Sequence, residues 1–110
     1  MDLAYTYFPV CENIFKDKVV CITGELLKFG RGREAAAKAI SLVGGIPKLS
    51  KVTKKTEILI VGDYFGEQKL KDAYKLKESG QNIEIVSDLC LYAVLIQENV
   101  WHNYFYLDKK

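Results

Sequence analysis

Two short segments of the chain consist entirely of apolar residues. Residues 19–22 read VVCI and residues 58–61 read ILIV, without the alternation of a strand that has one face in water. Such continuous β-branched runs are typical of parallel strands that are covered on both faces. Two further strands are predicted at residues 46–49 and 83–86, and Pro47 favours an edge position for the first of them.

Three other segments have the periodicity of helices. Residues 33–43 include three consecutive alanines and one apolar stripe, made of Ala36, Ile40 and Val43. Residues 67–77 are highly charged, and the predicted buried side of this helix is Leu70, Ala73, Tyr74 and Leu76. A last helix is predicted to begin at a cap formed by Ser87 and Asp88 and to run to about Gln97.

The predicted order of elements is β-α-β-β-α-β-α. Buried strands joined by helical crossovers indicate an α/β fold, a compact three-layer domain with a four-stranded parallel sheet flanked by helices. A length of 110 residues fits one such domain. We place it at residues 15–97, after an N-terminal arm at residues 1–14 and before an aromatic C-terminal tail at residues 98–110, which we expect to pack back onto the domain.

Composition excludes several classes of protein. The longest apolar stretch, residues 89–96, is far shorter than the ~20 residues of a membrane helix. The N-terminus has no basic segment typical of a secretory signal. The cysteines at positions 11, 21 and 90 form no C-x-x-C pair, so neither disulfides nor a zinc site is expected. We therefore expect a soluble cytoplasmic protein without a metal or cofactor.

The charges are unevenly distributed along the chain. Residues 28–77 contain 12 Lys/Arg and 5 Asp/Glu, a net charge of +7, whereas the remainder carries 4 and 9, a net charge of −5. This polarisation indicates a basic face that meets an anionic partner.

One group of residues has the chemistry of a phosphate site. Thr23 and Gly24 end the first strand, and Arg33 begins the helix that follows. In open α/β sheets ligands bind at the carboxyl ends of the strands, where helix N-termini offer free amides and a positive dipole. Lys69, at the start of the next helix, is expected to close this site from the other side, and the basic loop with Lys54 and Lys55 to contact a nucleic-acid backbone.

Motifs of the common enzyme classes fit poorly. Residues 30–35 match G-x-G-x-x-A, but they begin several residues after the strand and no acidic residue ends the second strand. The chain has no G-K-[ST] sequence, and its one histidine, His102, lies in the tail. We therefore expect no catalytic residues and a protein that is not an enzyme.

Six sequence blocks follow one another in a set order over residues 15–96. They are FKDKVVCITG at 15–24, REA at 33–35, GG at 44–45, VTKKTEILIVG at 52–62, KLKDA at 69–73 and IEIVS at 83–87. This pattern resembles BRCT domains, above all the single BRCT domains of bacterial NAD-dependent DNA ligases, bacterial DEDD-type exonucleases and the replication factor C large subunit.

The resemblance implies a non-catalytic module of DNA replication or repair. In the replication factor C type, the 5′ phosphate of DNA is held by a hydroxyl-glycine pair and two cations, here Thr23, Gly24, Arg33 and Lys69. The loop at residues 25–32 is about two residues longer than in the closest relatives, which makes Arg31 an alternative to Arg33. The expected partner is thus DNA at a 5′-phosphorylated end or nick, with replication or repair proteins as further partners.

Two alternatives remain open at this point. The domain can instead serve protein–protein interaction, through a phosphopeptide or a weak homodimer, or form part of a larger DNA ligase or exonuclease. Tyr64 and Phe65 follow the second apolar strand, and we favour a core-packing or loop-filling role for them over stacking on a terminal base.

Overall fold

The elements follow one another in the predicted order in a computed structural model that describes residues 12–98 and Val100. The strands are β1 (Val19–Thr23), β2 (Ile46–Pro47), β3 (Ile58–Val61) and β4 (Glu84–Ser87), and the helices are α2 (Gly32–Leu42), α3 (Glu67–Glu78) and α4 (Asp88–Gln97). Most of the predicted arm at residues 1–14 and most of the tail at residues 98–110 lie outside the described residues, so both stay predictions.

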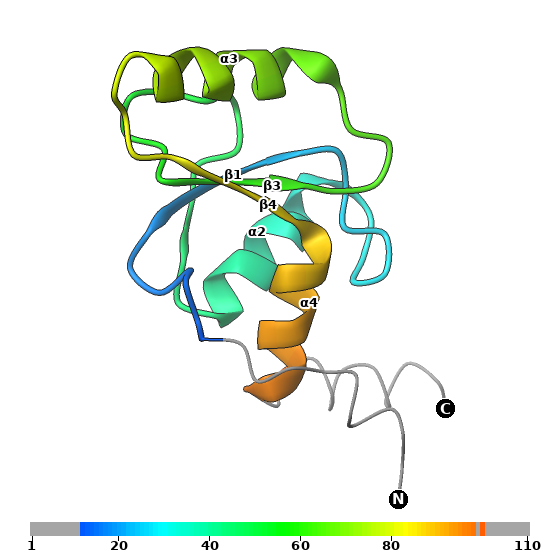
Figure 1. The fold of residues 1–110 in the computed structure, drawn as a ribbon. Coiled ribbons are helices and arrows are strands. Elements are labelled where there is room, and N and C mark those ends of the chain that lie inside the picture. The colour runs from blue at the N-terminus through cyan, green and yellow to red at the C-terminus, as the bar shows by residue number, and fades with distance from the viewer. Residues whose placement is uncertain (1–11, 99, 101–110) are drawn as a thin grey trace, which may run out of the picture.

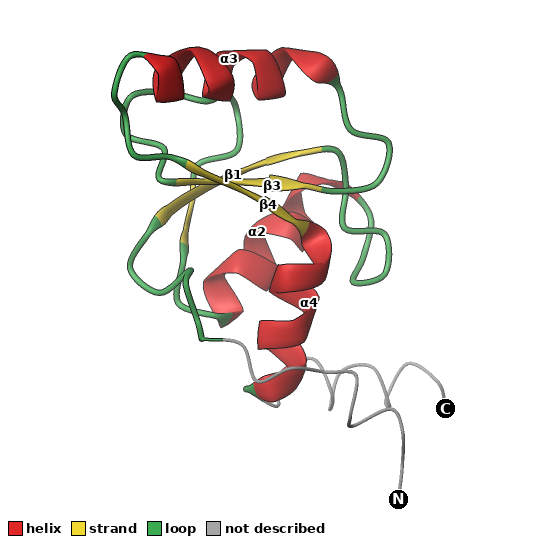
Figure 2. Ribbon diagram, in the orientation of Figure 1, coloured by secondary structure: helices red, strands yellow, loops and turns green. Residues whose placement is uncertain are grey.

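The four strands form one parallel sheet in the order β2-β1-β3-β4. The two continuous apolar runs become its central strands, in a register that pairs Cys21 with Leu59. Helices α2 and α4 lie on one face of the sheet and α3 lies on the other (Figures 1 and 2). The predicted three-layer α/β fold is therefore confirmed.

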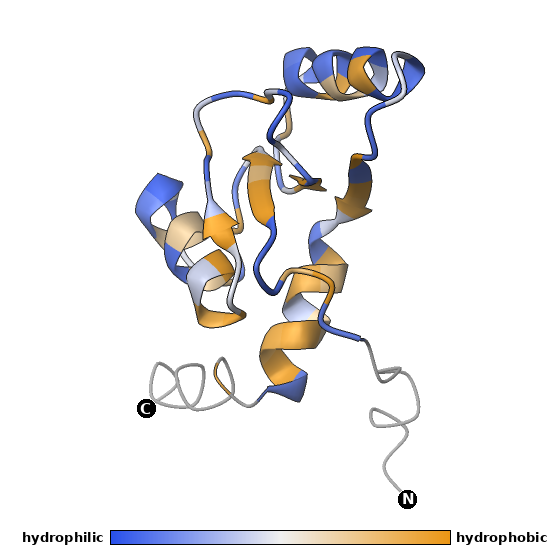
Figure 3. Cartoon of the chain, turned by 90° about the vertical axis from the view of Figure 1, so that its left-hand side faces the viewer, coloured by the Kyte–Doolittle hydropathy of each residue, from blue (hydrophilic) through white to orange (hydrophobic). Residues whose placement is uncertain are grey.

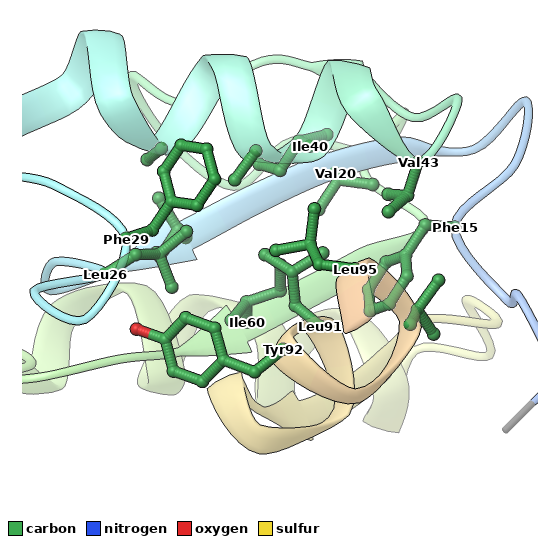
Figure 4. Packing of buried hydrophobic residues seen from close by; sticks show 14 of the residues in the cluster. Phe15, Val20, Leu26, Phe29, Ile40, Val43, Ile60, Leu91, Tyr92 and Leu95 are labelled. Atoms are coloured by element: carbon green, nitrogen blue, oxygen red, sulfur yellow. The ribbon is translucent and has the colours of Figure 1, made fainter. Parts of the chain in front are cut away.

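The larger core lies between the sheet and the pair α2 and α4. It packs side chains of β1 and β3 against both helices, and Figure 4 shows Phe15, Val20, Ile40, Ile60, Leu91 and Leu95 among them. The predicted apolar stripe of α2 is confirmed, because Ala36, Ile40 and Val43 are all buried. The last helix begins as predicted, with the Ser87 hydroxyl accepting a hydrogen bond from the Leu89 amide at 3.1 Å.

A smaller core lies on the opposite face, beneath α3. It contains Cys21 and Leu59 from the central strands with Ala73 from the helix. In Figure 3, α3 at the top is mostly hydrophilic, in contrast to the hydrophobic strands. The prediction that Tyr74 is buried is wrong, since this side chain is 56% exposed. Successive residues of a helix differ by about 100° in direction, so the helix that buries Ala73 turns Tyr74 away from the sheet.

The second strand is shorter than predicted. Only Ile46 and Pro47 pair with β1, at the edge of the sheet that the proline favours, and Ile46 is 43% exposed. None of the helices in the described part of the chain combines the length and the apolar composition needed to cross a lipid bilayer.

Candidate functional site

A solvent-open hollow of about 410 Å³ lies at the carboxyl edge of the sheet, between the end of β1 and the first turns of two helices. Its lining residues are Ile22, Gly24, Glu25, Gly32, Arg33, Ala36 and Lys69. Three of the predicted site residues, Gly24, Arg33 and Lys69, therefore meet here. They come from β1's end, α2 and α3, as expected where parallel strands end and helices begin.

Glycine is required at position 24 for two reasons. Its φ is +91°, a conformation that side chains with a Cβ adopt rarely. A Cβ built on Gly24 would also lie 2.4 Å from the Asp63 carbonyl oxygen, which is far closer than atoms can approach. The residue thus keeps this wall of the hollow free of a side chain and lets the loop after β3 pack directly against it.

The Thr23 hydroxyl is directed at a different partner from the one predicted. It donates to the Gly66 carbonyl and accepts from the Gly66 amide, both at 3.0 Å, and the residue is only 3% exposed. Its single proton is therefore already engaged. Thr23 is absent from the lining of the hollow, and its side chain fastens the start of α3 to the end of β1.

Lys69 is held in place by backbone carbonyls. Its ammonium donates to the Ile22 oxygen at 2.8 Å and to the Leu49 oxygen at 2.7 Å. An ammonium has three protons, and no other residue in the described part of the chain takes up the third, which is thus open to a ligand. Lys69 thus ties α3 to the sheet edge and also places a positive charge at the hollow.

Arg33 lies in the first turn of α2 with an exposed side chain. No hydrogen bond or salt bridge with another described residue engages it. Its guanidinium is therefore available for bidentate binding of a phosphate. Arg31 is also exposed, but it is the N-cap residue of α2 and is not among the lining residues of the hollow. The geometry therefore favours Arg33 of the two.

Glu25 is a site residue that the sequence reasoning missed. Its Oε1 accepts a hydrogen bond from the Gly32 amide at 2.9 Å, so an internal carboxylate binds the N-terminus of α2. The available signal was indirect: Arg31 at the N-cap position provides no side-chain cap, and the orphan amides of the first turn need an acceptor from elsewhere. A phosphate that binds at this helix N-terminus competes with the Glu25 carboxylate for the Gly32 amide.

Cys21 lies in the smaller core close to the same cations. Burial raises the pKa of its thiol, against the opposing effect of the positive charges of Lys69 and Arg33. A thiol that is buried and protonated is a poor nucleophile. Cys21 is therefore a buried packing residue of the smaller core.

The basic loop lies beside a separate hollow of about 410 Å³, against the second half of α3. Its lining residues are Lys51, Val52, Thr53, Lys54, Asp72, Lys75 and Leu76. Lys55 is exposed in the same loop and is not part of the lining. Lys54 and Lys55 are therefore not brought into the hollow that contains Arg33 and Lys69.

Tyr64 and Phe65 lie in the loop between β3 and α3. They are 87% and 50% exposed, so the core-packing part of the prediction is wrong for both residues. Within the described part of the chain, no group of three or more His, Cys, Asp or Glu side chains is placed to hold a metal ion. A comparison of the sequence with models of known protein families finds none that matches it.

Proposed function

We propose that this chain is a single BRCT-type module of DNA replication or repair that binds DNA at a 5′-phosphorylated end or nick. It performs no chemistry and instead positions the DNA or recruits a replication or repair protein, in the cytoplasm and, in a bacterium, at the nucleoid. The observation that carries the proposal is the meeting of Gly24, Arg33 and Lys69 at one hollow.

The chemistry of this hollow suits a terminal phosphate. A dianionic phosphate offers acceptors to the free guanidinium of Arg33 and to the remaining ammonium proton of Lys69. The dipole of α2 adds a partial positive charge at Gly32, on the same side. The solvent-open form of the hollow leaves space for the nucleotides that follow the phosphate. A phosphate inside a continuous strand lacks the second negative charge and the free end. We therefore expect the hollow to bind ends and nicks in preference to continuous duplex.

A fluorescence-anisotropy titration tests this proposal. Short duplexes with and without a 5′ phosphate are titrated at about 50 mM and about 200 mM salt, where backbone contacts alone weaken steeply. We expect tighter binding of the phosphorylated end, and we expect Arg33→Ala to weaken that binding by about 1.5–3 kcal/mol, as for a hydrogen bond to a charged group.

Two matched variants make the titration specific. Lys77→Ala removes the same charge from the last turn of α3, where the side chain is exposed, and controls for net charge. Arg31→Ala tests the alternative arginine. Equal binding of both kinds of end by the parent protein, or equal losses in the Arg33 and Lys77 variants, would refute the phosphate site.

A further inference from the structure

The loop that carries Tyr64 and Phe65 is anchored on both sides. The Gly62 amide donates to the Thr23 carbonyl at 2.9 Å, and Asp63 exchanges backbone hydrogen bonds with Glu25 at 2.7 and 2.9 Å. On the other side Gly66 is bound to the Thr23 hydroxyl. These bonds fix residues 62–66 against the wall of the hollow, with the two aromatic residues between the anchors.

Tyr64 has an uncommon backbone conformation. Its φ is +55°, in the left-handed region, which is strained for a bulky side chain. Glycine or asparagine would adopt this conformation at a lower energy. The strained residue is also 87% exposed, so packing within the domain does not account for the ring. Strain that is held by the surrounding structure is a common feature of binding sites.

The aromatic pair adjoins the cationic hollow. A Cβ built on Gly24, a lining residue, would lie 3.1 Å from the Cα of Phe65. Exposed aromatic residues in a loop that packs against Gly24, at the wall of a hollow lined by Arg33 and Lys69, combine the two elements that bind single-stranded nucleic acid, namely stacking surfaces and cations for the phosphates. A purely apolar surface of a protein partner would be unfavourable beside these charges. A nucleotide has both a flat base and a charged phosphate, so it is the ligand that we favour.

We infer that Tyr64 and Phe65 form a stacking platform for the base of the terminal nucleotide whose 5′ phosphate lies in the hollow. This inference rests on the proposed function, because the phosphate fixes which nucleotide reaches the rings. The platform reads no sequence, since every base has a face on which an aromatic ring stacks. It gives the domain a preference for ends at which the terminal base can leave its pair.

The test compares two substitutions and four probes. Tyr64→Gly removes the ring and relieves the strained φ, so this variant is expected to fold with a raised melting temperature. Tyr64→Phe keeps the ring and is the matched control. The probes are short duplexes that carry either a base or an abasic spacer at the 5′-terminal nucleotide, each with and without the 5′ phosphate.

We expect the parent protein and Tyr64→Phe to bind the phosphorylated end with a base at least about 5-fold more tightly than the abasic end, the lower limit for stacking on one aromatic ring. Tyr64→Gly should lose this difference and keep the preference for phosphate. If Tyr64→Gly discriminates the base as well as the parent does, the platform is refuted and the phosphate site stands.

The remaining outcomes separate the two proposals. A preference for the base without any preference for the phosphate supports the platform and refutes the phosphate site. A parent protein that binds none of the four probes refutes both.

Discussion

Glu25 performs the capping role that no side chain of α2 itself performs. Its carboxylate binds the Gly32 amide and lines the hollow in which Arg33 and Lys69 meet. The residue therefore stabilises the helix N-terminus and at the same time places a negative charge where the proposed phosphate binds. Glu25 is therefore expected to increase the stability of the helix and to decrease the affinity of the hollow for phosphate.

Glu25→Gln is expected to strengthen binding of a 5′-phosphorylated duplex by about fivefold. The reason is the loss of one repulsive charge, which is worth on the order of 1 kcal/mol at close range in water. Glu34→Gln, in the same first turn of α2 but absent from the lining of the hollow, is the control. Anisotropy titrations that show equal gains for both variants, or no gain for Glu25→Gln, would contradict this assignment.

We expect Tyr92 to make the stability of the folded domain decrease at alkaline pH. Burial and, to a lesser extent, the charge of Asp88 raise the pKa of this phenol from about 10 to about 12. Figure 4 shows its ring in the core opposite Leu26 and Phe29. The folded state thus holds the phenolic proton more tightly than the unfolded state does. This contribution to stability is complete below pH 10 and is lost as the pH rises through about 12.

We therefore expect urea unfolding of the parent protein to show a steeper loss of stability between pH 10 and about pH 12 than unfolding of Tyr92→Phe shows. The other tyrosines and the lysines are common to both proteins, so the difference reports on Tyr92. Identical pH dependence of the two proteins would show that the phenol titrates normally.

At the scale of elements, Lys69 connects a helix to the sheet edge. Its two hydrogen bonds run from α3 to the end of β1 and to the segment after β2, so the side chain has a structural role besides any ligand. Arg33 has no such role among the described residues. Substitutions at the two positions should separate folding from binding.

Lys69→Met is expected to lower the free energy of unfolding by about 1–3 kcal/mol, because two carbonyls at a partly buried site lose their donor. Arg33→Ala should leave it unchanged within about 0.5 kcal/mol, as for other exposed positions. Urea denaturation measures both values. A Lys69→Met protein as stable as the parent would mean that the two hydrogen bonds contribute nothing net.

The sequence was sufficient to predict the elements whose patterns are local. Val20 and Leu59 belong to apolar runs that only a strand buried on both faces explains, and both runs became central strands. The prediction for Tyr74 was wrong because this residue follows the buried Ala73 directly in the sequence, yet one position along a helix turns the side chain by about 100°, here away from the sheet. The cap of α4 was predictable because Ser87 lies beside Leu89 in the sequence, whereas the acceptor at the start of α2 is Glu25, seven residues before Gly32.

The residues of the candidate site likewise divide into those that were predictable from the sequence and those whose contacts depend on the conformation of a loop. Gly24, Arg33 and Lys69 were predictable, because parallel strands and following helices bring their ends to one edge by topology alone. The partner of the Thr23 hydroxyl was not, because Gly66 is 43 residues away and reaches it through the conformation of one loop. The capping bond of Glu25 depends in the same way on how its loop folds.

At the scale of the whole molecule, the cations divide into two groups. Arg33 and Lys69 line one hollow, and Lys54 with its neighbours lines another beside α3. We assign the first group to a terminal phosphate and the second to the backbone of the duplex, which every sequence presents. The two groups should therefore respond differently to salt.

The double variant Lys54→Ala/Lys55→Ala is expected to reduce the slope of log affinity against log salt concentration by up to about 2, since each backbone contact releases about 0.9 counterions. The preference for a phosphorylated end should persist. Titrations over a series of salt concentrations measure both quantities. Loss of the end preference together with the slope would place the phosphate at the basic loop instead.

The most direct test of the central claim is an NMR titration of the ¹⁵N-labelled protein with one short duplex, with and without its 5′ phosphate. The account predicts that the shift differences due to the phosphate are largest at the backbone amides of Gly24, Gly32, Arg33 and Lys69, which surround one hollow. Shift differences concentrated at residues 51–55, or absent throughout, would contradict the claim that this hollow binds a 5′ phosphate.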